Sequence, residues 1–403
     1  MSAPVSIAQH ESIAELRQGH PALADFWGLS ARALGVTLSL PFVESVESSP
    51  RTVVRYLSAV DAEGRLLGVL PAYLTSDEAN PYYDLAALTG APADGLYPSL
   101  LVGSRSGYRN GLLVDPALSP TDAAEVAGLL LSAAREHAVE AGARTVTAAF
   151  VDSASWATLA RAEPHAVDTT YFAIVDLALE LDRFHGETPA LAELDYHRWL
   201  GSDRSRKLRK QAARIVAAGS TETEGPLVDE LPVAADLLAQ HADTLGLRPT
   251  DWLDYVSQLA RVMGDRARLV LLRDAADEPI ACVVLLTDGT SVHTRAYGAR
   301  PGLRGDEYFE VGYRAPMLAA FRLGARRLHF GPEGCVPKLI RGATPEPLWT
   351  TVLPVGRAPV PPPAAAADQR LRTADAWRDR YARSAHRSMG ELIERLHELP
   401  PIT

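Results

Sequence analysis

The sequence predicts an α/β chain of two similar units, each a mixed central sheet flanked by helices, followed by a C-terminal helical tail. Two observations lead to this expectation. β-rich runs flank a short polar turn in each half, and each half then continues with a further strand, a helix and a strand. With 403 residues, 47% of them hydrophobic and 22% charged, the chain has the length of about two domains of 150 to 200 residues.

The first half supplies the clearest β signal. Residues 51–76 hold two β-rich runs around the turn Asp61-Ala62-Glu63-Gly64, whose residue types are typical of a hairpin. After a loop rich in Gly, Pro and Tyr, Ser119 is expected to cap a helix that runs to about Ala141. Residues 144–151 are then expected to form a strand.

The second half repeats this order. We expect strands at residues 268–273, 280–287 and 291–299, a helix over 308–323 and a strand over 327–330. No repeat is visible residue by residue, so the similarity of the two halves rests on the order of their elements.

Three segments connect or follow the two copies. Residues 170–181 alternate like a strand, and residues 196–219 are predicted to form one strongly basic helix. Residues 357–368 are expected to be a Pro/Ala linker, with a single exposed helix from there to His397. The expected domains are therefore an N-terminal domain 1–181, a C-terminal domain 182–356 that opens with the basic helix, and a tail 357–403.

The amino-acid composition excludes several classes of protein and of functional site. Lys and Arg total 40 against 50 Asp and Glu, which gives a formal net charge of -10. This charge excludes a protein that binds nucleic acid through a generally basic surface, but it does not exclude a local basic patch. The two cysteines, Cys282 and Cys335, exclude a disulfide scaffold and a Cys-rich metal site. Because no leader pattern or long apolar run is visible, we expect a cytoplasmic protein with no membrane span. We also expect no metal, because the sequence has no His-x-x-x-His ligand pair.

A glycine-containing loop precedes the helix expected at 308–323. Arg300, Arg304 and the neighbouring glycines would suit a pyrophosphate at a helix N-terminus. The strand order and this loop resemble the GNAT superfamily of acetyltransferases, whose acyl-CoA loop typically reads Arg/Gln-x-x-Gly-x-Gly/Ala. Here Asp306 and Glu307 follow Arg304-Gly305, and their carboxylates would repel a coenzyme A pyrophosphate. An ordinary Gly-rich turn is the alternative.

A more specific pattern follows. It combines a carboxylate-Val-x-Tyr helix start at Glu310–Tyr313, a Gly-Pro-x-Gly turn at Gly331–Gly334, and Lys-x-x-Arg-Gly at Lys338–Gly342 before a strand at Pro345–Trp349. This combination resembles a bacterial group of peptidoglycan biosynthesis proteins, which are relatives of the Fem transferases.

The basic helix gives a second match. Residues 202–214 resemble the Ser-x-x-x-Arg-x-x-Leu/Ile-Arg-Lys helix that opens the second half of Fem-like enzymes. Leu208, Ala212 and Ile215 form a narrow apolar stripe. The remaining faces carry six cations that are candidates for contacting a tRNA phosphate backbone: Arg204, Arg206, Lys207, Arg209, Lys210 and Arg214. A solvated surface helix is the alternative.

The resemblance implies a tandem GNAT fold that moves an amino acid from aminoacyl-tRNA to an amine without a metal or a covalent enzyme intermediate. By match to the family's lysine, Lys338 would contact the donor's carbonyl or terminal phosphate with help from Arg341. From their positions on the turn after the strand and at the helix start, Glu333 and Glu310 are candidates for binding the acceptor amine or acting as base. A surface carboxylate for Glu333 and a helix-dipole partner for Glu310 are the alternatives. The remaining expected substrate-binding residues are Tyr313, Arg300 and Arg304.

The sequence therefore predicts an amide-forming N-acyltransferase with no cofactor, which takes aminoacyl-tRNA as co-substrate and a small-molecule amine as acceptor. The expected setting is natural-product or cell-wall precursor biosynthesis. Two alternatives stay open at this point. One is an acyl-CoA-dependent N-acyltransferase, and the other is a non-catalytic binding protein on the same scaffold that uses its basic helix for an anionic partner.

Overall fold

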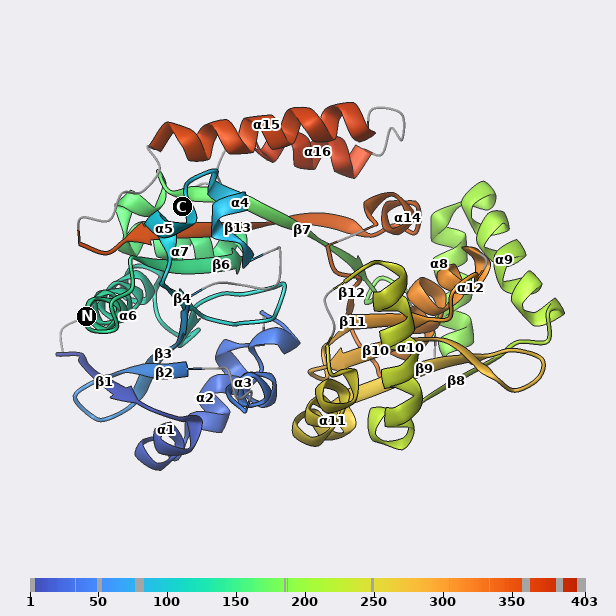
Figure 1. Ribbon diagram of the computed structural model, residues 1–403, viewed down its shortest axis with the longest axis horizontal. Coiled ribbons are helices and arrows are strands. Elements are labelled where there is room, and N and C mark those ends of the chain that lie inside the picture. Colours follow the sequence, from blue (N-terminus) through green and yellow to red (C-terminus); the bar gives the residue numbers. More distant parts are fainter. Residues whose placement is uncertain are drawn as a thin grey trace. The chain divides into compact units, whose positions relative to one another are not determined.

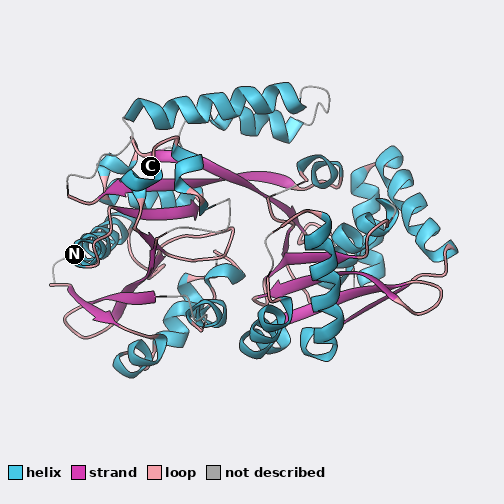
Figure 2. Ribbon diagram, in the orientation of Figure 1, coloured by secondary structure: helices cyan, strands magenta, loops and turns pink. Residues whose placement is uncertain are grey.

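The computed structural model forms two compact units, Met1–Asp176 with Pro345–Thr403, and Leu177–Thr344 (Figure 1). Each unit holds a mixed sheet flanked by helices, which confirms the predicted fold class (Figure 2). The predicted domain limits stay a prediction. The structure describes every residue except 1–3, 33, 49–52, 77–82, 185, 187, 248–249, 304, 333, 357–362, 382–386 and 397–403.

The sheet of the first unit has the strand order β1-β2-β3-β4-β6-β13-β7. β4 and β6 run parallel, whereas β1–β2, β2–β3, β3–β4 and β6–β13 are antiparallel pairs. A short strand, β5, pairs with β3. The strands are β1 (Ser6–His10), β2 (Val53–Val60), β3 (Leu66–Thr75), β4 (Ser99–Val102), β5 (Leu113–Val114), β6 (Thr145–Val151), β7 (Thr170–Glu180) and β13 (Thr344–Pro354).

The longest helix of this unit, α6 (Pro120–Glu140), starts as the sequence predicts, with the Ser119 side chain accepting a hydrogen bond from the Asp122 amide. It lies so close to β3 that a Cβ on Gly68 would be 2.9 Å from Val126 and Leu130. The other helices are α1 (Ile13–Gly19), α2 (Leu23–Ser30), η1 (Val36–Leu38), α3 (Leu40–Glu47), α4 (Leu85–Thr89), α5 (Ala93–Leu96), α7 (Ser153–Ala162), η3 (Pro164–Ala166), α15 (Pro363–Tyr381) and α16 (Arg387–Leu396).

The C-terminal tail differs from the single exposed helix that the sequence predicts. It forms α15 and α16, which pack against each other and bury Leu392 and Leu396. The Gln369 side chain also hydrogen-bonds both the amide and the carbonyl of Phe172, at 3.2 and 2.9 Å. The tail is therefore an integral part of the first unit. Residues 357–362 of the predicted linker lie outside the described residues.

The sheet of the second unit has the order β7-β12-β11-β10-β9-β8. β11 and β12 run parallel, but they pair only over Ser291–His293. Between Val284 and Leu285 the pairing of β10 with β11 shifts register. Because β11 pairs with β12 only up to His293, the later part of β11 is not paired with β12. The strands are β8 (Thr221–Pro226), β9 (Ala267–Arg273), β10 (Pro279–Thr287), β11 (Ser291–Ala299) and β12 (Arg327–His329).

The predicted basic helix 196–219 is two helices. Gly201 has φ +81°, which ends α8 (Pro189–Leu200) before α9 (Ser202–Ala217) begins. The other helices of this unit are η4 (Leu227–Glu230), α10 (Leu231–Thr244), α11 (Trp252–Met263), η5 (Gly264–Arg266), α12 (Gly305–Phe309), η6 (Glu310–Arg314), α13 (Ala315–Arg322) and α14 (Cys335–Ile340). In the described ranges, no helix has both the length and the apolar character needed to cross a membrane.

Candidate functional site

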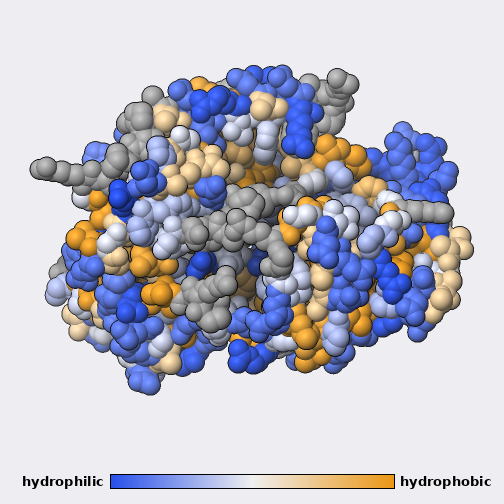
Figure 3. Space-filling model, viewed as in Figure 1, coloured by the Kyte–Doolittle hydropathy of each residue, from blue (hydrophilic) through white to orange (hydrophobic). Residues whose placement is uncertain are grey.

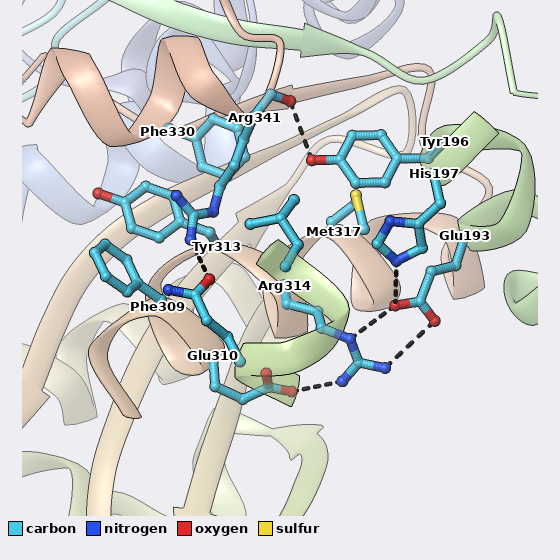
Figure 4. Close-up of a pocket in the computed structure, with 12 residues that line it drawn as sticks. Glu193, Tyr196, His197, Phe309, Glu310, Tyr313, Arg314, Met317, Phe330 and Arg341 are labelled. Atoms are coloured by element: carbon cyan, nitrogen blue, oxygen red, sulfur yellow. Dashed lines mark hydrogen bonds and ion pairs between the residues drawn. The ribbon is translucent and has the colours of Figure 1, made fainter. Parts of the chain in front are cut away.

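The second unit contains a small pocket, called the cavity below, between α8 and α9 on one side and the stretch from α12 to α13 on the other (Figure 4). Aromatic and aliphatic side chains form much of its wall, and ionic side chains lie among them. The lining residues are Glu193, Tyr196, His197, Leu208, Gln211, Phe309, Glu310, Tyr313, Arg314, Met317, Phe330 and Arg341.

A π-helical turn shapes one wall of the cavity. The predicted helix 308–323 is interrupted at η6, Glu310–Arg314, where the backbone takes a wider turn. Such turns alter the angular positions of side chains within a helix and are frequent at functional sites. Here the turn supplies Glu310, Tyr313 and Arg314 to the cavity, so two residues that the sequence singled out, Glu310 and Tyr313, come together.

Arg314 connects two carboxylates at the cavity. Its Nε and Nη2 donate to the two oxygens of Glu193, at 2.7 and 3.3 Å, and its Nη1 donates to Glu310 at 2.5 Å. Burial raises the pKa of the Glu193 carboxyl, but contact with His197 and the hydrogen bonds from Arg314 outweigh it, so that pKa lies below its usual value. Glu193 is therefore ionised, and its orientation is fixed by a bidentate partner.

The Arg341 guanidinium packs over two neighbouring aromatic rings, whose centres are 6.0 Å apart. Its guanidinium carbon lies 4.6 Å from the ring centres of Phe309 and of Tyr313. Its Nη1 donates to the carbonyl of Pro337 at 3.0 Å, and its Nη2 donates to the Gln211 side chain at 3.3 Å. Burial lowers the pKa of this guanidinium. Arg341 thus lies on the cavity wall, with α9 beside it.

Lys338 does not line the cavity. It is 6% exposed, and its Nζ donates to the carbonyls of Phe330 and Gly331 at 2.6 and 2.8 Å. These bonds tie α14 to the end of β12 and thereby position Phe330, which does line the cavity. The predicted role of Lys338 in binding the donor stays a prediction.

Close packing against Trp199 explains why the Lys-x-x-Arg-Gly motif ends in a glycine. Gly342 has φ +85°, and a Cβ there would lie 2.2 Å from the Trp199 ring of α8. The Tyr196 hydroxyl also donates to the Arg341 carbonyl at 3.1 Å. The motif therefore holds α8 against the end of α14, next to the cavity.

The remaining predicted site residues are placed as follows. Arg300 forms an ion pair with Glu278 at 3.0 Å and is not among the lining residues. Glu333 and Arg304 lie outside the described residues. Their predicted roles stay predictions.

All six predicted tRNA-contacting cations of α9 are exposed, and the surface over this helix is strongly hydrophilic (upper right of Figure 3). Two of them have acidic partners. Arg206 pairs with Asp203 at 3.2 Å, and Arg214 donates to both oxygens of Asp306 at 2.5 and 2.6 Å. The opposite face of α9 contributes Leu208 and Gln211 to the cavity wall.

The contribution of α8 to the cavity is not predicted from the sequence. Glu193, Tyr196 and His197 all line the cavity, and His197 Nε2 lies 3.8 Å from Glu193 Oε1. A signal for this helix exists in the sequence. Thr188 caps it through the Leu191 amide and Pro189 occupies its first turn, after which Glu193 and His197 are four residues apart and share one face. Within the described part of the chain, no group of three or more His, Cys, Asp or Glu side chains is placed to hold a metal ion.

The family model of the acetyltransferase (GNAT) domain matches residues 202–338. These residues carry a GNAT domain. The match starts at α9 and ends within α14, so the GNAT domain includes most residues that line the cavity. It confirms the prediction of a GNAT-type acyltransferase.

Solved structures share the architecture. FemX superposes with a TM-score of 0.57 at 12% identity, covering 86% of this chain and 97% of that one, which confirms the Fem-like resemblance at the level of the fold. The C-terminal domain of a putative lysylphosphatidylglycerol synthetase from Agrobacterium fabrum gives 0.48 at 12% identity, covering 82% and 91%. L-PGS from Bacillus licheniformis gives 0.46 at 10%, covering 84% and 92%. Comparison with curated proteins found no match.

Proposed function

We propose that this GNAT-type acyltransferase takes its acyl group from an aminoacyl-tRNA and transfers it to a small amine acceptor, forming an amide. One observation carries the proposal. One face of helix α9 exposes six cations, and its opposite face contributes Leu208 and Gln211 to the cavity wall. A polyphosphate donor bound along the outer face would have its acylated end within reach of the cavity.

The chemistry of the cavity is compatible with aminolysis of an ester. That reaction needs a positioned amine, a proton acceptor and a donor for the developing oxyanion. Carboxylates and an imidazole are present in Glu193, Glu310 and His197, and hydrogen-bond donors are present in Tyr313 and Arg341. A small diffusible amine, in natural-product or cell-wall precursor biosynthesis, is the acceptor we propose.

An acyl-CoA donor is the second candidate, and the acetyltransferase description of the matching family supports it. The start of α12 argues against it. Asp306 and Glu307 occupy its first turn. Arg214 pairs with Asp306, but Glu307 places negative charge at the position that a coenzyme A pyrophosphate would approach.

The test is binding of purified protein to bulk charged tRNA and, separately, to coenzyme A, each at two salt concentrations. A variant with Lys207, Arg209 and Lys210 replaced by Glu is compared with a matched variant in which three exposed arginines of α15, Arg372, Arg378 and Arg380, are replaced by Glu. Both variants change the net charge equally, so a general charge effect would appear in both.

We expect tRNA binding with a steep salt dependence in the wild type and in the α15 variant, and its loss in the α9 variant. Equal loss in both variants would show non-specific attraction and contradict the role of α9. Binding of coenzyme A without binding of tRNA would replace the proposed donor with acyl-CoA.

A further inference from the structure

One ring nitrogen of a cavity-lining histidine lacks a hydrogen-bond partner among the described residues. His197 lines the cavity, and its Nδ1 is buried with no hydrogen-bond partner among the described residues. A buried polar atom without a partner is destabilising. A polar group of a bound substrate would offset that destabilisation, so His197 has a reason to contact whatever enters the cavity.

The other ring nitrogen has a carboxylate. His197 Nε2 lies 3.8 Å from Oε1 of Glu193, one helical turn earlier on α8. Glu193 in turn is fixed by two hydrogen bonds from Arg314. A carboxylate at Nε2 favours the tautomer that carries its proton there and leaves a lone pair on Nδ1. Glu193 therefore lies beside the ring nitrogen opposite the one that would take a proton.

The cavity surrounds this imidazole with groups that bear on its charge. Glu193 and Tyr196 are on its own helix, and the Tyr196 ring centre is 5.5 Å from that of His197. The π-helical turn contributes Glu310 and Arg314. Figure 4 shows Tyr313 and the guanidinium of Arg341 across the cavity from His197. The space between these two walls is where the reacting atoms would meet.

We propose that His197 is the general base of the transfer reaction, with Glu193 as its positioning residue; this rests on the proposed function. The acceptor amine, having lost its ammonium proton to solvent, attacks the carbonyl carbon of the aminoacyl ester. As the C–N bond forms, Nδ1 of His197 takes the second proton from the attacking nitrogen. The bond from the carbonyl carbon to the ribose oxygen then breaks, and the imidazolium returns that proton to the ribose oxygen. The products are an amide and a tRNA hydroxyl.

The test measures formation of base-stable amides from total tRNA charged with radiolabelled amino acids and a panel of primary alkylamines. Wild type is compared with His197→Ala, His197→Gln, Glu193→Gln and the exposed control His165→Ala. We expect His197→Ala to lose about 100-fold or more in kcat, since general bases contribute about 10²–10⁴-fold. Binding of charged tRNA should be unchanged. Added imidazole should restore part of the rate to His197→Ala and none to His197→Gln or the control.

The outcomes separate this proposal from the proposed function. If wild type transfers and both His197 variants retain its kcat within about threefold, His197 is not the base, and the proposed function stands. A loss of kcat without imidazole rescue, accompanied by a lower Tm, would assign His197 a structural role instead. If wild type transfers nothing from charged tRNA, the donor proposal fails. The same variants are then assayed with acetyl-coenzyme A, where an unchanged or absent rate overturns the assignment of His197.

Discussion

Arg214 near the end of α9 binds both carboxylate oxygens of Asp306 in the first turn of α12, at 2.5 and 2.6 Å. The two helices are far apart in the sequence. This contact fixes the basic helix to the stretch that leads into the π-helical turn. It also gives the acidic first turn of α12 a cation from the protein itself.

The six cations of α9 should therefore contribute unequally to tRNA binding. The slope of log K against log salt is negative, and Lys210→Ala should reduce its magnitude by about 0.7–0.9, the value of one lost phosphate contact. Arg214→Ala should lower it less, because Arg214 is already bound to Asp306. Binding isotherms at four salt concentrations measure both slopes. A larger effect at Arg214 would show that its bond to Asp306 opens when tRNA binds.

Gly342 should not tolerate a side chain. Gly342→Ala adds a Cβ 2.2 Å from the Trp199 ring, at a residue with φ +85°. Overpacking typically costs about 1–3 kcal/mol, and the left-handed backbone adds about 1–2 kcal/mol. Urea unfolding should show that loss. Gly289→Ala, also at positive φ but with open space around its Cβ, separates the backbone cost from the clash. Equal losses in the two variants would mean that Trp199 moves aside freely.

Stability should depend on pH through Glu222. Burial, and next the Glu310 carboxylate, raise the pKa of Glu222 from 4.5 to about 7. The folded protein therefore keeps a proton that the unfolded chain releases above about pH 4.5. The free energy of unfolding should fall as pH rises from about 4.5 to 7, by at most about 1.4 kcal/mol per pH unit. Glu222→Gln should flatten this dependence, and Glu278→Gln, an exposed control, should not. Identical pH profiles for wild type and Glu222→Gln would contradict the shifted pKa.

The first unit depends on a buried arginine. Arg109 is 6% exposed and contacts Glu346, Asp176 and Asp152 at 2.7, 3.4 and 3.5 Å. Arg109→Met would leave these carboxylates without their cation, which should cost about 3–5 kcal/mol. Because burial raises the pKa of Asp152, the loss should be smaller at pH 5 than at pH 8. Denaturant unfolding measures it, with the exposed Arg144→Met as control. A loss below about 1 kcal/mol would mean that water enters the site.

Local patterns predicted much of the fold. The hairpin around Asp61–Gly64 and the helix capped by Ser119 follow the sequence closely, because turn chemistry and capping act between neighbouring residues. The predicted basic helix 196–219 is too long, because Gly201, whose φ is +81°, ends α8. The expectation of one exposed helix in the tail was wrong. The burial of Leu392 and Leu396 depends on tertiary packing, which local sequence patterns do not predict.

The site was predicted in part, for a similar reason. Motif resemblance pointed to Glu310, Tyr313 and Arg341, which line one cavity. It could not show that Lys338 donates to main-chain carbonyls, because those bonds depend on how α14 meets β12. Nor did it find Glu193 and His197, whose significance arises only when α8 packs beside the π-helical turn.

The first compact unit takes its residues from two separate stretches, Met1–Asp176 and Pro345–Thr403, and encloses Leu177–Thr344 in sequence. During synthesis, residues 177–344 leave the ribosome as a complete set, while the first unit still lacks β13 and the α15–α16 pair. At about 5–20 residues per second, the missing 59 residues take roughly 3 to 12 s to add. The second unit can therefore fold on the ribosome before the first unit is complete, and chaperones would meet residues 1–176 while that unit still lacks its last strand and helices.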